Sequence, residues 1–205
     1  MIIFHAVEQG TEAWRKIRRG IWTGSIAIRL LQGKSMPREY DWDGNDATRR
    51  GHALEHAMIR EYERKYRRAI ARPGFVTNTV YPNAGFSPDG LDGGWLLEMK
   101  AFQNEKLQSL IKNKSTKNAQ EIIASNIPLE VKVQIFFGMI ITGKRKARLL
   151  AIDPDAIDRE QLTVIEIGYD VLIGKNFRAK LRADLKKRLA GGSVADELGL
   201  VRIEA

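Results

Sequence analysis

Two carboxylates and one lysine near the middle of the chain could together catalyse a hydrolysis. Asp89 stands in the turn-forming run Pro88-Asp89-Gly90, and Glu98 and Lys100 lie in the largely apolar segment that follows. Residues two apart in a strand point to the same face, so Glu98 and Lys100 should lie side by side. A hairpin would bring Asp89 to the same place. Two adjacent carboxylates repel each other unless a cation joins them.

This carboxylate pair also indicates which cation and which substrate to expect. Oxygen ligands favour a hard ion, so we expect Mg²⁺, with Mn²⁺ as the alternative. Mg²⁺ usually keeps several waters and accepts phosphate oxygens, which suits a phosphodiester substrate. Lys100 beside the ion could steer or deprotonate the attacking water and offset charge on the phosphate.

The same residues resemble the signature of the PD-(D/E)xK nuclease superfamily, Pro88-Asp89 followed by Glu98-x-Lys100. Three further blocks, in the same order, resemble the phage lambda exonuclease (YqaJ-type) recombinases. They are the Val7 to Ser25 block with Trp14 and Arg18, the helical Gly51-x-x-x-Glu55, and Val133-Gln134 in an apolar segment. The resemblance implies an α/β, restriction-endonuclease-like fold, with a mixed central sheet flanked by helices in a single domain of residues 1–205.

The resemblance implies a role for each matching residue. It assigns the active site to Glu55, Asp89, Glu98, Lys100 and Gln134. Asp89 and Glu98 would hold the metal together with the carbonyl of Met99, and Lys100 would position the water. Arg18 and Ser25 would bind the 5′-phosphate of a DNA end.

Plainer interpretations stand beside two of these active-site roles. Glu55 could be a solvated helix carboxylate, although its spacing from Ile59 and Tyr62 puts it at the border of an apolar face, where a carboxylate needs a partner. Gln134 lies among apolar residues, and a buried amide must be hydrogen-bonded, so it could be a structural core residue.

The phosphate-binding pair also has a plainer interpretation. Ser25 is a good N-cap for a helix through Leu31, whose free N–H groups would bind an anion, and Arg18 can grip a phosphate with two donors. Taken alone, they could equally be an ordinary cap and an exposed arginine. His52 and His56 are four apart on a helix, but no further His or Cys nearby completes a zinc site.

The composition favours a nucleic-acid partner. Among 205 residues there are 34 Lys and Arg against 25 Asp and Glu, a net charge of +9. A protein this basic is suited to a polyanion. Trp22, Trp42 and the lysines between 106 and 117 are candidates for DNA contacts, or else part of an ordinary solvated surface.

Other composition features exclude several classes of protein. With no cysteine, disulfides, thiolate metal sites and a cysteine nucleophile are excluded. No apolar run reaches the roughly 20 residues of a membrane helix. Residues 1–5 lack the pattern of a secretion signal. We expect the cytoplasm of a bacterial host, with a phage or prophage origin and no membrane partner.

The elements that must position these residues follow from periodicity and turn signals. We expect helices over 11–20, 25–31, 51–67, 128–142 and 170–189, and a surface loop over 33–50. Strands are expected over 74–81, 95–101, 147–153 and 161–167, with a turn over 88–94.

The resemblance implies a Mg²⁺-dependent exodeoxyribonuclease. It would digest one strand of double-stranded DNA from the 5′ end, releasing mononucleotides and leaving 3′ overhangs for recombination. It would act as a homotrimer with a single-strand annealing protein as partner. The alternatives are a restriction-type endonuclease and a DNA-binding module without catalysis, whose acidic residues merely form a salt-bridged hairpin.

Overall fold

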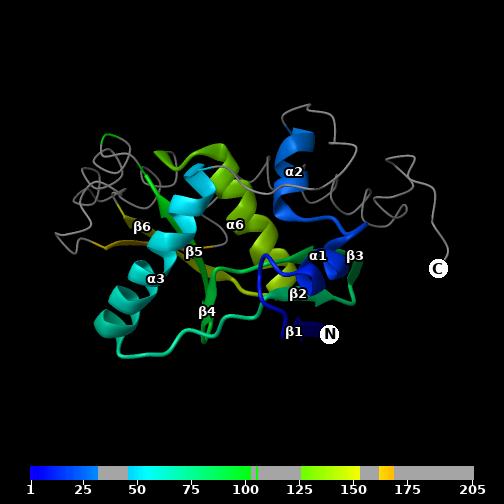
Figure 1. Cartoon of the computed structure of the whole chain (residues 1–205), viewed down its shortest axis with the longest axis horizontal. Helices are drawn as coiled ribbons and strands as arrows, with labels where there is room; N and C mark the ends of the chain where they lie inside the picture. Colours follow the sequence, from blue (N-terminus) through cyan, green and yellow to red (C-terminus); the bar gives the residue numbers. More distant parts are fainter. Residues whose placement is uncertain (32–45, 103–104, 106–125, 153–161, 169–205) are drawn as a thin grey trace.

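The computed structural model describes residues 1–31, 46–102, 105, 126–152 and 162–168, which build two β-sheets and the helices around them (Figure 1). The smaller sheet has the strand order β1-β2-β3 and is antiparallel throughout. Its strands are β1 (Ile2–His5), β2 (Phe75–Asn78) and β3 (Tyr81–Phe86).

The larger sheet has the strand order β4-β5-β6-β7 and is mixed. Its strands are β4 (Gly90–Asp92), β5 (Trp95–Ala101), β6 (Lys146–Ile152) and β7 (Thr163–Gly168). Strands β5 and β6 are parallel, and the other two pairs are antiparallel. Because a parallel pair needs a long crossover, the chain returns through helix α6 (Leu129–Thr142) before β6 begins.

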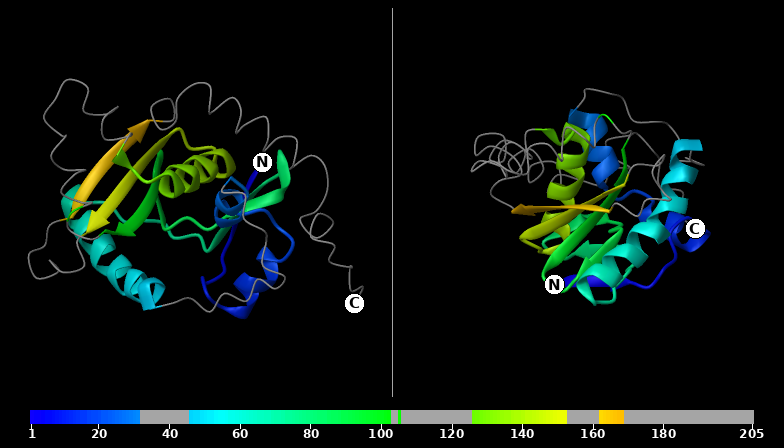
Figure 2. Two further views of the ribbon diagram at one scale, coloured as in Figure 1. Left: turned by 90° about the horizontal axis from the view of Figure 1, so that it is seen from above. Right: turned by 90° about the vertical axis from the view of Figure 1, so that its left-hand side faces the viewer.

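Helices lie on both faces of the larger sheet, with α6 on one face and α3 (Asp46–Tyr66) on the other (Figure 2). Side chains alternate along a strand, so β5 contributes to both interiors. Leu96 packs in the cluster around α6, whereas Leu97 packs with Met58 under α3. The mixed sheet flanked by helices that the sequence predicts is therefore confirmed.

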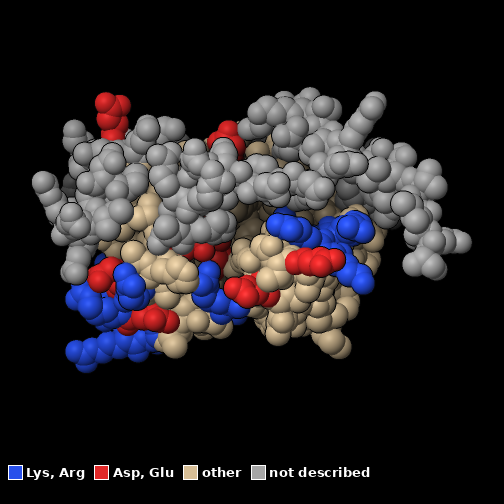
Figure 3. Space-filling view, viewed as in Figure 1, with Lys and Arg blue, Asp and Glu red and all other residues tan. Residues whose placement is uncertain are grey.

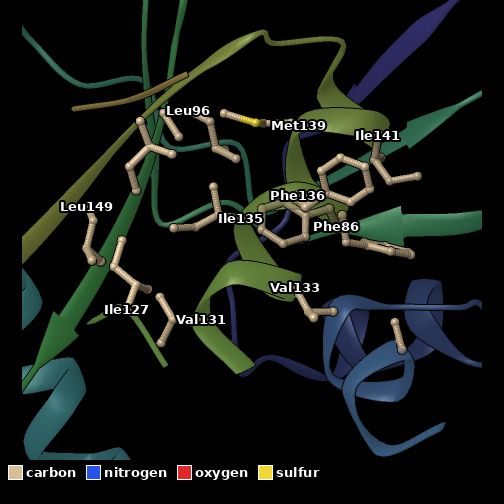
Figure 4. Packing of buried hydrophobic residues seen from close by; sticks show 14 of the residues in the cluster. Phe86, Leu96, Ile127, Val131, Val133, Ile135, Phe136, Met139, Ile141 and Leu149 are labelled. Carbon is tan, nitrogen blue, oxygen red and sulfur yellow. The ribbon is translucent and has the colours of Figure 1, made fainter. Parts of the chain in front are cut away.

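Helix α6 is buried along most of its length because it packs between the two sheets. Its Phe136 lies in one cluster with Phe86 of β3 and Leu149 of β6 (Figure 4). Pro128 occupies the N-cap position. The helix ends at Gly143, whose φ of 66° is a left-handed conformation that glycine adopts without strain. The predicted helix over 128–142 is confirmed.

Two helix starts differ from the sequence prediction. Helix α2 (Gly24–Leu31) begins before Ser25, and the Ala27 amide donates to the Thr23 carbonyl, so Ser25 lies in the first turn rather than at the cap. Helix α3 begins at Asp46, inside the segment predicted as a loop over 33–50. Helix α1 (Glu12–Arg18) lies within the predicted range, and its N-cap Thr11 accepts a hydrogen bond from the Trp14 amide.

Several predictions fall outside the described residues. They concern the helix over 170–189, Trp42 and the lysines over 106–117, and most of the loop over 33–50. The single domain of residues 1–205 stays a prediction. Trp22, proposed as a DNA contact, is 2% exposed and packs in the core, so that prediction is wrong. Within the described ranges, no helix is both long and apolar enough to cross a membrane.

Candidate active site

The β4–β5 hairpin brings Asp89 opposite Glu98. Asp92 pairs with Trp95 and Gly90 with Leu97, so the two arms are joined by a two-residue turn. Gly93 opens this turn with a φ of 54°, which glycine supplies easily. Asp89 directly precedes β4, and its Oδ2 accepts a hydrogen bond of 2.7 Å from the Met99 amide. The expected hairpin is thus present, with Asp89 beside the centre of the other arm.

Glu98 and Lys100 share the face of β5 that lies toward α6. The Lys100 Nζ donates to Glu98 Oε1 at 2.5 Å. Glu98 is fully buried, whereas the Lys100 side chain is 28% exposed. Lys100 therefore connects a buried carboxylate to the solvent side of the site.

Burial and mutual charge shift the pKa values of both Glu98 and Lys100. Burial raises the pKa of Glu98 to about 8; the charges of Asp89 and Glu55 add to this, while the Lys100 ammonium opposes it. Burial lowers the pKa of Lys100, but the carboxylates of Glu98 and Asp89 more than offset this and leave it raised. A carboxylate charge in this position is costly and calls for a further positive partner.

Glu55 reaches this group from α3, on the other side of the sheet. Its side chain is 18% exposed, and Arg72 Nη2 lies 3.2 Å from its Oε2. Its charge acts on both Glu98 and Lys100. The structure therefore brings Glu55 close to the three hairpin residues, with Arg72 as a partner that sequence reasoning did not find.

Gln134 occupies the half-buried side of α6 rather than a fully buried position. Its side chain lies beside Gly24, the first residue of α2. A Cβ added at Gly24 would be in van der Waals contact with Gln134 Cγ, at 3.6 Å. The same Cβ would lie 3.6 Å from Phe86. Gln134 thus lies where α6, α2 and β3 meet.

Arg18 and Ser25 lie on consecutive helices. The Arg18 guanidinium stacks on the Trp14 ring, 3.9 Å from its centroid. Trp14 Nε1 donates to Ser87 Oγ at 2.9 Å, in the segment that leads into Asp89. Ser25 is exposed, with its Oγ 3.1 Å from Thr23 Oγ1. A chain of contacts therefore links Arg18, through Trp14, to the segment that leads into the β4–β5 hairpin.

A family model described as the YqaJ-like viral recombinase domain matches residues 13–145. The match covers more than half of the sequence and all of the hairpin. The chain belongs to this family. It is a nuclease of the phage recombination type, and the family and enzyme class expected from its residues are confirmed.

Solved structures share the fold of this YqaJ-like domain. An alkaline exonuclease from Laribacter hongkongensis (LHK-Exo) is 20% identical, with a TM-score of 0.64 over 94% of this chain and 96% of that one. The complex of LHK-Exo with dAMP is 21% identical in sequence and has a TM-score of 0.63, with the same coverage of both chains. A phage-related exonuclease from Haemophilus somnus is 13% identical in sequence and has a TM-score of 0.50. This match covers 94% of this chain and 88% of that one. At these identities the likeness establishes the restriction-endonuclease-like fold. No curated protein sequence matches the chain.

The hairpin of this YqaJ-like domain fits a divalent cation. In the described part of the chain, Glu98 Oε2 is buried without a hydrogen-bond partner. A buried carboxylate oxygen of this kind is suited to a positive ligand. Asp89 lies across the hairpin and supplies a second carboxylate. Oxygen donors of this type suit Mg²⁺ or Mn²⁺.

Asp89 and Glu98 are the side-chain donors that the hairpin supplies. No three His, Asp or Glu side chains come close enough together, among residues with described positions, to bind one metal ion. The His52 side chain lies outside the described residues, so the His52–His56 alternative is not tested, and the role of Glu55 stays a prediction.

A polar network that sequence reasoning missed ties α3 to the hairpin. Tyr62 Oη donates to Asp92 Oδ2 at 2.7 Å, and Arg148 Nη1 donates to Tyr62 Oη at 2.5 Å. Arg148 also stacks 4.2 Å from the ring centroids of both Tyr66 and Trp95. Tyr62 shows helical apolar spacing, but nothing in the sequence indicates partners 30 and 86 residues away.

Proposed function

We propose that the chain is a Mg²⁺-dependent 5′-to-3′ exodeoxyribonuclease acting on the ends of double-stranded DNA. It would release mononucleotides and leave 3′ overhangs for phage-type recombination. The observation that carries this proposal is the buried Glu98, with one oxygen bonded to Lys100 and the other without a partner, facing Asp89 across a short hairpin.

Each site residue has a role in this proposal. Asp89 and Glu98 would hold the cation with the Met99 carbonyl, and the cation would polarise the scissile phosphate and activate water. The Met99 amide holds the Asp89 carboxylate in place. Lys100 would orient the attacking water and offset charge on the phosphate, because its ammonium is fixed by Glu98 and still reaches solvent.

Glu55 and Gln134 would complete the active site. The charge of Glu55 reaches Glu98, which supports a role beside the cation. Gln134 lies beside the start of α2, where it could orient a DNA strand bound by that helix. One of the LHK-Exo structures is a complex with dAMP, a mononucleotide of the kind such a reaction would release.

The 5′-to-3′ direction of digestion would be set by Arg18 and Ser25, which would bind the 5′-phosphate of the DNA end. Arg18 is stacked on Trp14, which bonds to the segment before Asp89, so a phosphate held there would lie in register with the hairpin. We expect Arg18→Ala to slow digestion of 5′-phosphorylated ends by at least tenfold, with a much smaller effect on 5′-hydroxyl ends. Equal losses on both substrates would contradict the pocket.

The proposal includes a homotrimer, a single-strand annealing protein as partner and action in the cytoplasm of a bacterial host. A closed ring around DNA would explain processive digestion, since the protein need not dissociate after each cut. Sedimentation of the purified chain would test the trimer.

The central experiment is a time course on 5′-phosphorylated linear duplex and on closed circular duplex, with Mg²⁺ and with EDTA. We expect mononucleotides from the linear duplex, in Mg²⁺ only, and no change in the circle. Cleavage of the circle would favour the endonuclease, and binding without cleavage would favour the inert module. The variant Lys100→Ala controls for a contaminating nuclease.

A further inference from the structure

The short connection between the two sheets carries Asp89 to its place beside β5. Strand β3 of the smaller sheet ends at Phe86 and β4 of the larger sheet begins at Gly90, so residues 87–89 alone join them. Pro88 is buried, and its ring fixes its φ angle. The ψ angle of Pro88 is the angle that remains to be set, because it turns the peptide plane that Pro88 shares with Asp89.

Gln9 holds this peptide plane from outside the connection. Its Nε2 donates a hydrogen bond of 3.2 Å to the Pro88 carbonyl. Because that carbonyl and the Asp89 amide lie in one rigid plane, the bond restrains the backbone from which the Asp89 side chain extends. The carboxylate at the other end of this side chain accepts from the Met99 amide at 2.7 Å. Asp89 is thus held both at its backbone and at its carboxylate.

Gln9 itself belongs to a turn that its neighbours hold in place. The Thr11 amide and hydroxyl both donate to the Glu8 carbonyl, at 3.3 and 2.7 Å. Gly10 has a φ of 85°, a left-handed conformation that glycine adopts without strain. The Gln9 side chain therefore starts from a backbone of defined shape.

Trp14 gives the connection a second support, one residue earlier. Its Nε1 donates to Ser87 Oγ at 2.9 Å and to the Gly74 carbonyl at 3.2 Å. Ser87 precedes a proline, which restricts it to extended conformations. A Cβ at Gly74 would lie 1.4 Å from the Val7 carbonyl oxygen, so the N-terminal segment lies directly against this part of the chain. The N-terminal segment therefore holds the connection at two successive residues.

We propose that Gln9 is a positioning residue that holds Asp89 in the geometry that binds the cation. This inference rests on the proposed cation site. Without the Gln9 amide, the buried Pro88 carbonyl loses a donor and the peptide plane gains freedom to rotate. The Asp89 carboxylate must then be ordered when the cation binds, and this cost lowers the affinity for the cation.

The test is calorimetric titration of Mn²⁺ into the metal-free chain, well below its melting temperature. Gln9→Met keeps the length of the side chain but cannot donate a hydrogen bond. We expect it to weaken Mn²⁺ binding by about three- to tenfold, the usual effect of losing one hydrogen bond. The Mn²⁺ concentration for half-maximal cleavage should rise by the same factor, while the KM for duplex DNA should not change.

A matched control separates positioning from loss of stability. Asn78 Nδ2 donates to the Ile141 carbonyl at 3.1 Å, a buried bond between a side-chain amide and the backbone, away from the hairpin. Both Asn78→Ala and Gln9→Met should lower the melting temperature in EDTA, because each leaves a buried carbonyl without its donor. Asn78→Ala should nevertheless bind Mn²⁺ as the wild type does.

Unchanged Mn²⁺ affinity in Gln9→Met would overturn the inference, as would an equal loss of affinity in Asn78→Ala. The control for the site itself is Asp89→Asn. If the wild type binds Mn²⁺ no better than this variant, the cation site fails, and the inference with it.

Discussion

Lys100 is the residue at which catalysis can be separated from assembly of the site. Its removal leaves Asp89 and Glu98 in place, because the hairpin register does not depend on it. We expect Lys100→Ala to lower the cleavage rate by about 10² to 10⁴-fold, the usual contribution of a group that positions or transfers a proton. DNA binding in Ca²⁺ should stay near the wild type, whereas the melting temperature should fall because the buried Glu98 loses its partner. Normal turnover would remove Lys100 from the mechanism.

Glu98 makes the cation-free protein sensitive to pH. Its pKa is raised to about 8 in the folded chain, from an ordinary value of 4.5, with burial as the main cause. Between these values the folded state holds a proton that the unfolded state has lost. The contribution of Glu98 to the free energy of unfolding in EDTA should therefore be fully present below pH 4.5. It should be lost as the pH rises toward 8.

Thermal unfolding in EDTA at pH 5.5 and pH 8 measures this effect. Glu98→Gln cannot ionise, so its melting temperature should decline less over the same interval, while cleavage is lost. Addition of Mg²⁺ should stabilise the wild type at pH 8 and leave the variant largely unaffected. Identical pH profiles for the two proteins would contradict a buried, proton-binding Glu98.

At the scale of elements, α6 shows how closely the two sheets are packed together. A Cβ at Gly138 would lie 2.7 Å from Phe86 of β3 and 2.8 Å from Leu96 of β5. We expect Gly138→Ala to lower the free energy of unfolding by about 1 to 3 kcal/mol through overpacking. Chemical denaturation in EDTA would measure it.

Gly51 in α3 is a matched control for this substitution. Among the residues whose positions the structure gives, a Cβ there meets no atom within 4 Å, so Gly51→Ala should raise the free energy of unfolding by about 0.5 to 1 kcal/mol through helix propensity. Equal effects of the two substitutions would contradict the packing described for α6.

The helices with clear periodicity and strands β5, β6 and β7 were predictable from the sequence. The strand expected over 74–81 is instead two antiparallel strands, β2 and the start of β3, because the chain turns between Asn78 and Tyr81.

The turn expected over 88–94 is shorter in the structure, because Gly90–Asp92 form β4 and only residues 93 and 94 make the reversal. The hairpin itself was predicted, and its pairing brings Asp89 to Glu98. The start of α2 was misplaced by one residue because Ser25 and Thr23 are both good caps and only the backbone decides between them. Strand β1 has no period long enough to mark it, since its edge position leaves Ile3 and Phe4 exposed.

Contacts between distant segments account for what the sequence could not predict. The pairing of Glu55 with Arg72, and of Asp92 with Tyr62 and Arg148, depends on how α3 lies across the sheet. No local pattern encodes this arrangement. The same is true of Trp22, whose aromatic ring suited a DNA contact as well as a core position.

For the whole molecule, the net charge of +9 is the dominant feature. On the face drawn in Figure 3, basic side chains gather toward both ends, with acidic side chains among and between them. Basic residues also end two helices: the last turn of α1 carries Arg15, Lys16 and Arg18, and that of α3 carries Arg64 and Lys65.

DNA binding should therefore depend strongly on salt. We expect the affinity for a duplex to fall at least tenfold between 50 and 200 mM NaCl, because each phosphate contact releases counterions. Fluorescence anisotropy with the Lys100→Ala variant would measure this without digestion. An affinity that does not change with salt would argue against a charged DNA-binding face.

The parallel pairing of β5 with β6 has a consequence for when the enzyme becomes active during its synthesis. Glu98 pairs with Leu149, so the strand that carries the acidic site gains its second neighbour only after some fifty more residues have left the ribosome. Until then the hairpin lacks both β6 and the cover of α6. A nascent or prematurely terminated chain should therefore leave DNA uncut.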